Sequence, residues 1–286
     1  MIHVFSNERL TVSADELGAE ICSVKMNGTE YIWQGEPPYW SSHAINLFPV
    51  CGRMFEGKYT WRGKTFELML HGFARTTNFI WDQEKNIFHT ESNEQTKKVY
   101  PFDFSLDIQY ELRDNTLVCR DIVKNTGNDP LPFTIGAHPG FRVPLREDES
   151  FEDYVIEVEN GRNALRRVIS ERHLDSGMNE PFAFEKDTLK LKHSLFDHDG
   201  IFLQNIGDTV SLKDKNGKAR VVVKCGQANY WGIWQDPKTE APFVCIEPWY
   251  GMAGADGKIE EFDEKINTVS LEPGKSFTFQ YQIIFG

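Results

Sequence analysis

The sequence predicts an all-β protein, a large antiparallel β-sandwich, and three observations carry that prediction. Many short segments alternate apolar and polar side chains with a period of two, as strands with one face in a core do. Glycine, asparagine and aspartate stand between these segments, where tight turns need them. Almost no stretch repeats its apolar residues with the period of a helix. This combination is typical of an antiparallel sandwich or barrel.

In the N-terminal third, the sequence predicts strands joined by hairpins. Ser13–Lys25 could form a helix, but its glycine and β-branched residues favour a strand. Asn27-Gly28 is a strong hairpin signal, and Tyr31–Trp33 then resumes a strand. A second hairpin is expected to turn at Arg62–Lys64.

The rest of the chain repeats the strand pattern, except that residues 161–198 show no regular periodicity. Turn signals at Asp114-Asn115 and Asn216-Gly217 each join two strands. No repeat, low-complexity tract or linker divides the chain, so we expect a single domain over residues 1–286. The further predicted strands are Ile87–Glu91, Phe104–Leu112, Thr116–Lys124, Tyr154–Val158, Ile201–Gln204, Thr209–Leu212, Arg220–Lys224, Trp231–Trp234 and Ser276–Phe285.

The composition limits the partners of this acidic chain. Its 286 residues include 31 basic and 43 acidic side chains, a net charge of -12, with 40% hydrophobic residues. Nucleic acids and anionic membranes bind to basic faces, so we expect neither as a partner. No apolar run reaches the roughly 18 residues of a membrane span, and the N-terminus lacks a signal-peptide pattern. Five scattered cysteines without a Cys-x-x-Cys pair indicate buried free thiols in a cytoplasmic protein.

Three apolar segments each contain a single glutamate or histidine, close to a proline or glycine. A residue before proline is pushed into an extended conformation, so we expect His138 to end a buried strand. The other two ionisable groups are likewise expected at strand ends, and the three together indicate an acid, a base and a polar anchor converging on one cleft. The segments are Leu131–Phe141, Ala241–Ala255 and Leu68–Ala74, and their ionisable residues are His138, Glu247 and His71.

Each of these residues has a functional and a structural interpretation. Burial would raise the pKa of Glu247 towards neutrality and suit it to act as a base, although pairing with an arginine such as Arg53 would make it structural. His138 titrates near neutral pH and suits a general acid, but it could also be a hydrogen-bonded core residue. His71 could instead lie in a turn with its imidazole bonded to the backbone.

Other side chains could bind a polar ligand. Arg53 and Arg75 follow apolar stretches and could donate to hydroxyls or a phosphate, or lie free on the surface. Asp197 and Asp199 precede a strand, where an Asp-Gly turn is the alternative interpretation. Trp249 could pack against the C–H face of a sugar or simply fill the core. The sequence contains no phosphate loop, serine-hydrolase motif or metal-binding pattern, and Glu247 has no clear carboxylate partner of the kind that a glycosidase needs.

Four motifs, in order along the chain, resemble those of aldose 1-epimerases, the galactose mutarotases. The resemblance is closest to the mutarotase-like subgroup that also contains hexose-6-phosphate mutarotases. It implies the galactose mutarotase-like supersandwich, and it implies no metal or organic cofactor. The motifs are Asn46–Arg53, Leu70–Arg75, Ile135–Phe141 and Cys245–Trp249.

The resemblance also implies roles for individual residues. Glu247 matches the base that takes the proton from the anomeric hydroxyl O1, and His138 matches the acid that protonates the ring oxygen. His71 and Arg53 match substrate-binding positions, and the family's sugar-binding aspartate falls at Asp199, with Asp197 as the alternative. Pro-Gly-Phe follows His138 where better-studied mutarotases have an aromatic residue and then Phe-Asn, which leaves the preferred sugar open.

Three functions therefore compete at this point. The first is a mutarotase for free hexoses, and the second is a hexose-6-phosphate mutarotase, which needs a basic pocket. The third is a carbohydrate-binding protein that has lost the chemistry, although both candidate proton-transfer groups argue against it. The expected partner is a small sugar in each case, and the sequence leaves a homodimer open.

Overall fold

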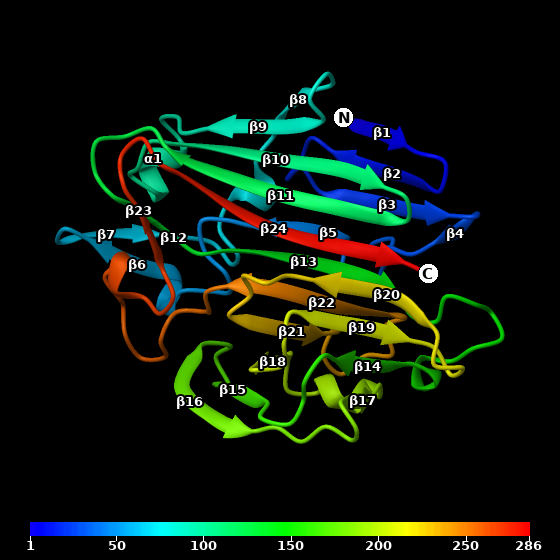
Figure 1. The fold of residues 1–286 in the computed structure, drawn as a ribbon. Coiled ribbons are helices and arrows are strands. Elements are labelled where there is room, and N and C mark those ends of the chain that lie inside the picture. The colour runs from blue at the N-terminus through cyan, green and yellow to red at the C-terminus, as the bar shows by residue number, and fades with distance from the viewer.

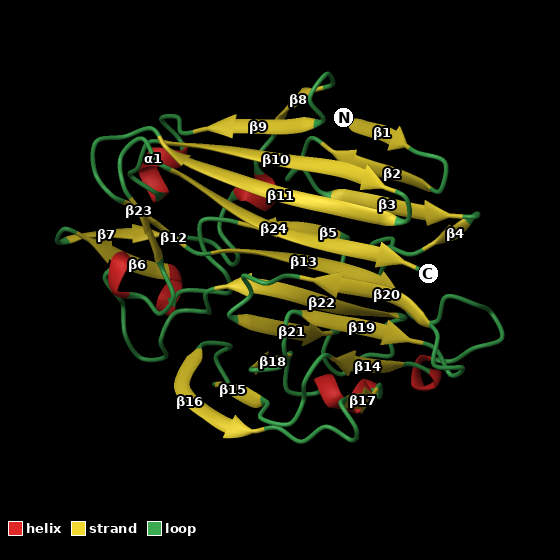
Figure 2. Cartoon of the chain, viewed as in Figure 1, coloured by secondary structure: helices red, strands yellow, loops and turns green.

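The structure, a computed structural model that describes residues 1–286, consists almost entirely of antiparallel strands (Figures 1 and 2). The predicted fold class is confirmed. Helix is limited to the single turn α1 (Thr96–Val99) and five short 3-10 turns, and no helix has the length and apolar character to cross a membrane. The 3-10 turns are Phe55–Gly57, Ala74–Thr76, Phe151–Asp153, His193–Phe196 and Phe262–Glu264.

The largest sheet has nine strands and runs diagonally across the front of Figure 1. Its two long central hairpin strands and the C-terminal strand β24 provide most of its inward-facing apolar side chains. In order across the sheet, the strands are β17 (Thr188–Lys190), β14 (Val155–Val158), β19 (Thr209–Lys213), β20 (Ala219–Lys224), β24 (Ser276–Phe285), β11 (Thr116–Asn125), β10 (Phe104–Arg113), β9 (Ile87–Glu91) and β8 (Ile80–Asp82).

A seven-stranded sheet packs behind the first and carries the motifs of interest. In order, its strands are β16 (Asp175–Pro181), β15 (Leu165–Ile169), β18 (Ile201–Gln204), β21 (Tyr230–Trp234), β22 (Phe243–Tyr250), β13 (Ile135–Arg142) and β5 (Ala44–Leu47). The smaller sheets are formed by β1 (Ile2–Ser6), β2 (Leu10–Asp15), β3 (Ile21–Met26) and β4 (Thr29–Glu30), by β6 (Lys58–Trp61) with β7 (Lys64–Glu67), and by β12 (Leu131–Phe133) with β23 (Val269–Leu271).

The alternation of side chains along β22 divides its residues between two environments. Val244 and Ile246 belong to the main apolar core, which also contains side chains of the nine-stranded sheet. Cys245, Glu247 and Trp249 point to the opposite face of the seven-stranded sheet, because successive strand residues alternate sides. That opposite face, away from the sandwich core, is where a site can form.

The predicted hairpin turns agree with the structure. Asn27 and Gly28 both have positive φ, 51° and 81°, as a type I′ turn requires. Arg62 and Gly63 do the same at 50° and 77° between β6 and β7, and Asp114 turns β10 into β11 at 52°.

Three local predictions were wrong. Ser13–Lys25 is two strands, β2 and β3, because the chain turns between them at Gly18, where a Cβ would lie 2.9 Å from the Arg75 carbonyl oxygen. Tyr31–Trp33 is not a strand, since only Ile32 forms an isolated bridge. Residues 161–198 contain β15, β16 and β17, whose many exposed side chains hid the strand pattern.

Candidate active site

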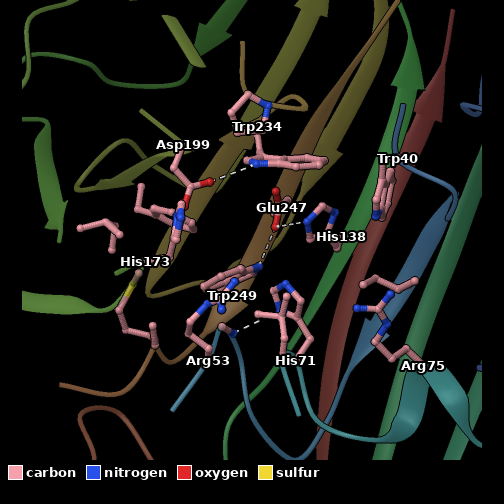
Figure 3. Close-up of a pocket in the computed structure, with 18 residues that line it drawn as sticks. Trp40, Arg53, His71, Arg75, His138, His173, Asp199, Trp234, Glu247 and Trp249 are labelled. Atoms are coloured by element: carbon pink, nitrogen blue, oxygen red, sulfur yellow. Dashed lines mark hydrogen bonds and ion pairs between the residues drawn. The ribbon is translucent and has the colours of Figure 1, made fainter. Parts of the chain in front are cut away.

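A cavity of about 350 Å³ opens on the outer face of the seven-stranded sheet (Figure 3). Side chains of β5, β13, β18, β21 and β22 form its walls together with the loops before and after them. The structure brings all seven of the predicted site residues to this one cavity: Arg53, His71, Arg75, His138, Asp199, Glu247 and Trp249.

His138 and Glu247 lie within strands, not at strand ends as predicted, and two prolines explain the difference. β13 and β22 pair at Gly136–Trp249 and again at Gly140–Cys245, but not between those pairs. Pro139 and Pro248 occupy the interruption, where a residue without an N–H cannot complete the ladder. Each strand stays in the sheet through its other neighbour, β5 or β21. The prolines therefore interrupt the pairing beside the two ionisable groups without ending either strand.

The two groups face each other across this interruption. His138 Nε2 lies 3.3 Å from Glu247 Oε2, and their side chains are 8% and 1% exposed. The Trp249 indole N–H donates a hydrogen bond to the same oxygen, Glu247 Oε2, at 3.1 Å. His138 Nδ1 and Glu247 Oε1 are buried without a protein partner. Glu247 therefore pairs with a histidine and not with Arg53, and each group keeps an unused polar atom.

Burial disfavours charge on both members of this pair. Loss of solvation raises the pKa of Glu247 well above its ordinary value, Asp199 adds to the rise, and the Trp249 hydrogen bond opposes it. Loss of solvation likewise lowers the pKa of His138 to about 3. Both shifts favour the uncharged forms, a carboxylic acid beside a neutral imidazole, so the pair shares one proton across the 3.3 Å contact.

His71 lies in a left-handed turn after β7, not at the end of a strand. Its φ is 63°, its amide donates to the Gly52 carbonyl, and the Gly52 amide donates to His71 Nδ1 at 3.1 Å. The following Gly72 also has positive φ, and a Cβ there would lie 2.2 Å from the Phe48 carbonyl oxygen. The backbone-bonded interpretation of His71 is thus correct, and the same bond leaves the hydrogen on Nε2, where it can be donated to a ligand.

Asp199, and not Asp197, lines the cavity. Its Oδ1 accepts hydrogen bonds from the Trp234 indole at 3.1 Å and the Gly200 amide at 2.8 Å. Its Oδ2 lies 2.5 Å from His173 Nδ1. The carboxylate is therefore fixed beside Trp234, and Glu247 lies between it and His138 in the view of Figure 3.

The amino-acid sequence and the fold both match one protein family. The sequence model of aldose 1-epimerases matches residues 1–283. The chain belongs to the aldose 1-epimerase family. It is 30% identical over 278 residues to the chromosomal protein LacX of Lactococcus lactis subsp. lactis, a match that covers 92% of this chain and 93% of LacX.

Solved structures of bacterial relatives superpose on this family member along almost the whole chain. A galactose mutarotase-related enzyme from Lactobacillus acidophilus is 32% identical, with a TM-score of 0.93 over 100% of this chain and 97% of the other. A galactose mutarotase-like protein from Lactobacillus casei is 27% identical, with a TM-score of 0.94 and full coverage of both chains. The resemblance stated from the four motifs is therefore confirmed at the level of family and fold.

Two arginines give this aldose 1-epimerase family member an electropositive rim. Neither Arg53 nor Arg75 has an acidic partner, whereas Arg167 and Arg172 nearby pair with Asp175 and Asp256. Arg75 also disfavours the protonated form of His138, because like charges repel.

Among the cavity residues that sequence analysis did not predict, His173 and Trp234 are the two that contact Asp199. His173 lies in the turn between β15 and β16, within the stretch where no strands were predicted, so no local pattern pointed to it. Trp234 ends a predicted strand, and its alternation with the buried Ile233 could have placed it on the same face as Glu247. Trp40 and Trp234 flank the imidazole of His138 with ring centroids at 4.8 and 5.3 Å.

One group of donor atoms in the site resembles a metal site in composition. His138, Cys245 and Glu247 each offer one donor atom, all within 4.8 Å of one another. Burial raises the pKa values of Cys245 and Glu247 well above their ordinary values, which favours the protonated form of each. A metal ion needs deprotonated ligands, so an ion bound here would have to displace both of these protons.

Proposed function

We propose that this chain is an aldose 1-epimerase that interconverts the α and β anomers of a hexose. The observation that carries the proposal is the buried contact of 3.3 Å between His138 and Glu247 on the wall of the cavity. Ring opening removes a proton from O1 and adds one to O5, so an acid and a base are needed along one edge of the sugar. Membership of the aldose 1-epimerase family supports the same chemistry.

The single proton of the pair fits both stages of such a reaction. In the ion-pair form, the Glu247 carboxylate takes the proton from O1 while the His138 imidazolium gives one to O5. The C1–O5 bond breaks, and the electron pair left on O1 forms the C1=O1 bond of the aldehyde. The products on the protein are a carboxylic acid and a neutral imidazole, the form that burial favours. Rotation about C1–C2 and the reverse transfers close the other anomer.

The remaining side chains hold the sugar against this pair. His71 Nε2 donates to a ring or hydroxyl oxygen, since its Nδ1 is occupied by the Gly52 amide. Asp199 accepts from sugar hydroxyls, fixed by its three protein donors. Trp249 presents an aromatic surface to the C–H face of the ring. Such positioning favours the geometry in which O1 and O5 meet the pair.

Polarimetry on freshly dissolved α-D-glucose and α-D-galactose tests this function. Addition of the protein is expected to accelerate the approach to the equilibrium rotation, and a variant Glu247→Gln is expected to remove most of the acceleration. If neither sugar nor any other free aldose is accelerated, the proposal of a free-hexose mutarotase is wrong.

A hexose-6-phosphate mutarotase is the second candidate, and the two unpaired arginines favour it. A phosphate needs positive groups that are not already neutralised by carboxylates. Arg53 and Arg75 meet that condition in a chain whose net charge is -12. Exchange NMR between the anomers of glucose 6-phosphate and galactose 6-phosphate, beside the free sugars, separates the two candidates. A kcat/KM that is higher for the phosphates assigns the second function, and a higher value for the free sugars assigns the first.

A further inference from the structure

A buried lysine contacts the backbone of a residue that lines the cavity. Lys265 follows the 3-10 turn Phe262–Glu264 and is 2% exposed. Its Nζ donates a hydrogen bond to the Met252 carbonyl oxygen, and no carboxylate is close enough to form an ion pair with it. This ammonium is therefore held by a backbone carbonyl alone, directly behind a residue that lines the cavity.

Met252 begins a short strip of backbone, Met252–Ala255, which we call the cavity floor. Its first two residues, Met252 and Ala253, line the cavity. The Gly254 amide donates to the Arg53 carbonyl at 2.8 Å, and the Gly254 carbonyl accepts from the Asp175 amide at 2.9 Å. The strip thus connects a rim arginine to the start of β16, just after the turn that carries His173.

Two further contacts hold the strip, and one of them leads to a polar group of the site. A Cβ on Gly52 would lie 2.7 Å from the Cβ of Ala253, so these two backbones are in close contact. The amide of Gly52 is the one that orients His71 through Nδ1. From behind, the buried carboxylate of Glu260 accepts the Ala255 amide at 2.7 Å. A shift of the strip would therefore move Gly52, His71 and Arg53 together.

Packing alone does not require a charge at position 265. Burial lowers the pKa of Lys265 to about 8, while Cys51, Glu260 and Asp175 favour its charged form. An unpaired buried cation destabilises a fold, and an apolar side chain of similar length removes that cost. Burying this lysine therefore lowers the free energy of unfolding, and its one hydrogen bond is to the Met252 carbonyl oxygen.

We infer that Lys265 is a positioning residue, whose bond to the Met252 carbonyl fixes the cavity floor and, through Gly52, the sugar-binding groups His71 and Arg53. This inference builds on the proposed function, because it concerns the same site. Lys265 does not touch the sugar, Glu247 or His138, so its loss should weaken sugar binding more than it slows the chemical step.

The variant Lys265→Met tests this role, with the exposed Lys275→Met as the control for loss of one positive charge. We expect KM for the preferred aldose to rise about tenfold, the size of one hydrogen bond to a charged group, with kcat changed less than about twofold. The urea midpoint at pH 7 should change little, because removal of the buried charge offsets loss of the donor to the Met252 carbonyl. Lys275→Met should match the wild type in all three quantities.

Two outcomes would overturn the inference. An unchanged KM means that the floor does not depend on Lys265. A parallel fall of kcat, kcat/KM and the urea midpoint means that the lysine only supports the fold.

Hydrogen exchange separates failure of this inference from failure of the proposed function. The amides of Gly52, Gly254 and Ala255 should exchange faster in Lys265→Met than in the wild type, a result that needs no catalysis. If exchange accelerates but wild-type protein moves no aldose towards anomeric equilibrium, the positioning role holds and the proposed function fails. If exchange at these amides is unchanged, the positioning role fails whatever the wild-type rate.

Discussion

Glu247 and Asp121 are both buried carboxyl groups, yet they lie in different parts of the molecule. Each is 1% exposed. Burial raises the pKa of both, that of Asp121 to about 8. Asp121 is on β11 in the nine-stranded sheet, close to the side chains of Tyr110, Cys119 and Tyr281. It does not line the cavity that contains Glu247.

The comparison shows what burial alone does not provide. Glu247 lies 3.3 Å from His138, with which it can exchange a proton, and accepts a hydrogen bond from the Trp249 indole on the same oxygen. It also lines the cavity. Asp121 has no ion-pair partner, and its Oδ1, like Glu247 Oε1, is buried without a hydrogen bond. A perturbed pKa marks both residues, but only access to a ligand and a partner for the proton can make such a group catalytic.

Removing the proton partner should produce the largest effect. His138→Asn keeps a polar side chain of similar size but cannot carry the proton, so kcat should fall about 10²–10⁴-fold. Asp121→Asn should leave kcat within about twofold, because Asp121 does not line the cavity. Anomerisation rates of His138→Asn and Asp121→Asn under saturating sugar test this difference. Equal losses of kcat would mean that the cavity pair is no more important for the reaction than Asp121.

The raised pKa of Asp121 should instead appear in the pH dependence of the free energy of unfolding. Its folded pKa of about 8 lies above the ordinary 3.8, so the folded protein keeps a proton that the unfolded chain releases. Its contribution to stability therefore falls as pH rises from about 4 to about 8, by up to about 1.4 kcal/mol per pH unit.

Asp121→Asn should remove this part of the slope. Urea unfolding of wild type and variant at pH 5 and pH 8 checks it, with the difference between the two proteins as the readout. A variant that loses as much stability as the wild type over this interval would show that Asp121 does not hold its proton in the fold.

Removing the positive charge of Arg75 should weaken substrate binding more than it slows proton transfer by Glu247 and His138. Arg75→Met is expected to lower kcat/KM for a hexose 6-phosphate about tenfold or more, and for the free hexose much less. Arg142→Met, at an exposed arginine that also has no acidic partner, is the control. Equal effects of Arg75→Met on both classes of sugar would count against a phosphate site at this rim.

The smallest effect should follow from removing the hydrogen bond that Glu247 accepts from Trp249, a bond that Asp121 lacks. Trp249→Phe removes the indole donor that lowers the pKa of Glu247. We expect kcat to fall by up to about tenfold, the size of one net hydrogen bond. Thermal unfolding of the variant controls for lost packing against Phe202, and an unchanged kcat in a folded variant would mean that the indole does not tune the carboxyl.

Much of the site followed from the sequence because its residues interrupt apolar strands. His138 and Glu247 stood out as single ionisable groups beside prolines, and the structure places them on one wall. The same prolines misled the prediction of strand ends, since pairing to outer neighbours carries both strands onward. The alternating pattern of β11 placed Asp121 among half-buried residues but did not single it out.

Long-range contacts set the limit of sequence-based prediction. His173 and Asp199 meet although 26 residues separate them, and the hairpin between β15 and β16 has too many exposed side chains to show a strand period. Lys265 reaches the cavity floor only through the fold of the chain around Met252. Local periodicity carries no information about contacts between residues that are far apart in the sequence.

Exchange NMR at anomeric equilibrium tests the central claim, that the Glu247–His138 pair drives anomer interconversion, most directly. Wild type, Glu247→Gln and Asp121→Asn would be compared with the hexose or hexose phosphate that polarimetry and NMR select. We predict fast α–β exchange with wild type and Asp121→Asn, and a loss of at least about 10²-fold with a folded Glu247→Gln. Near wild-type exchange in Glu247→Gln would contradict the assignment of the reaction to this pair.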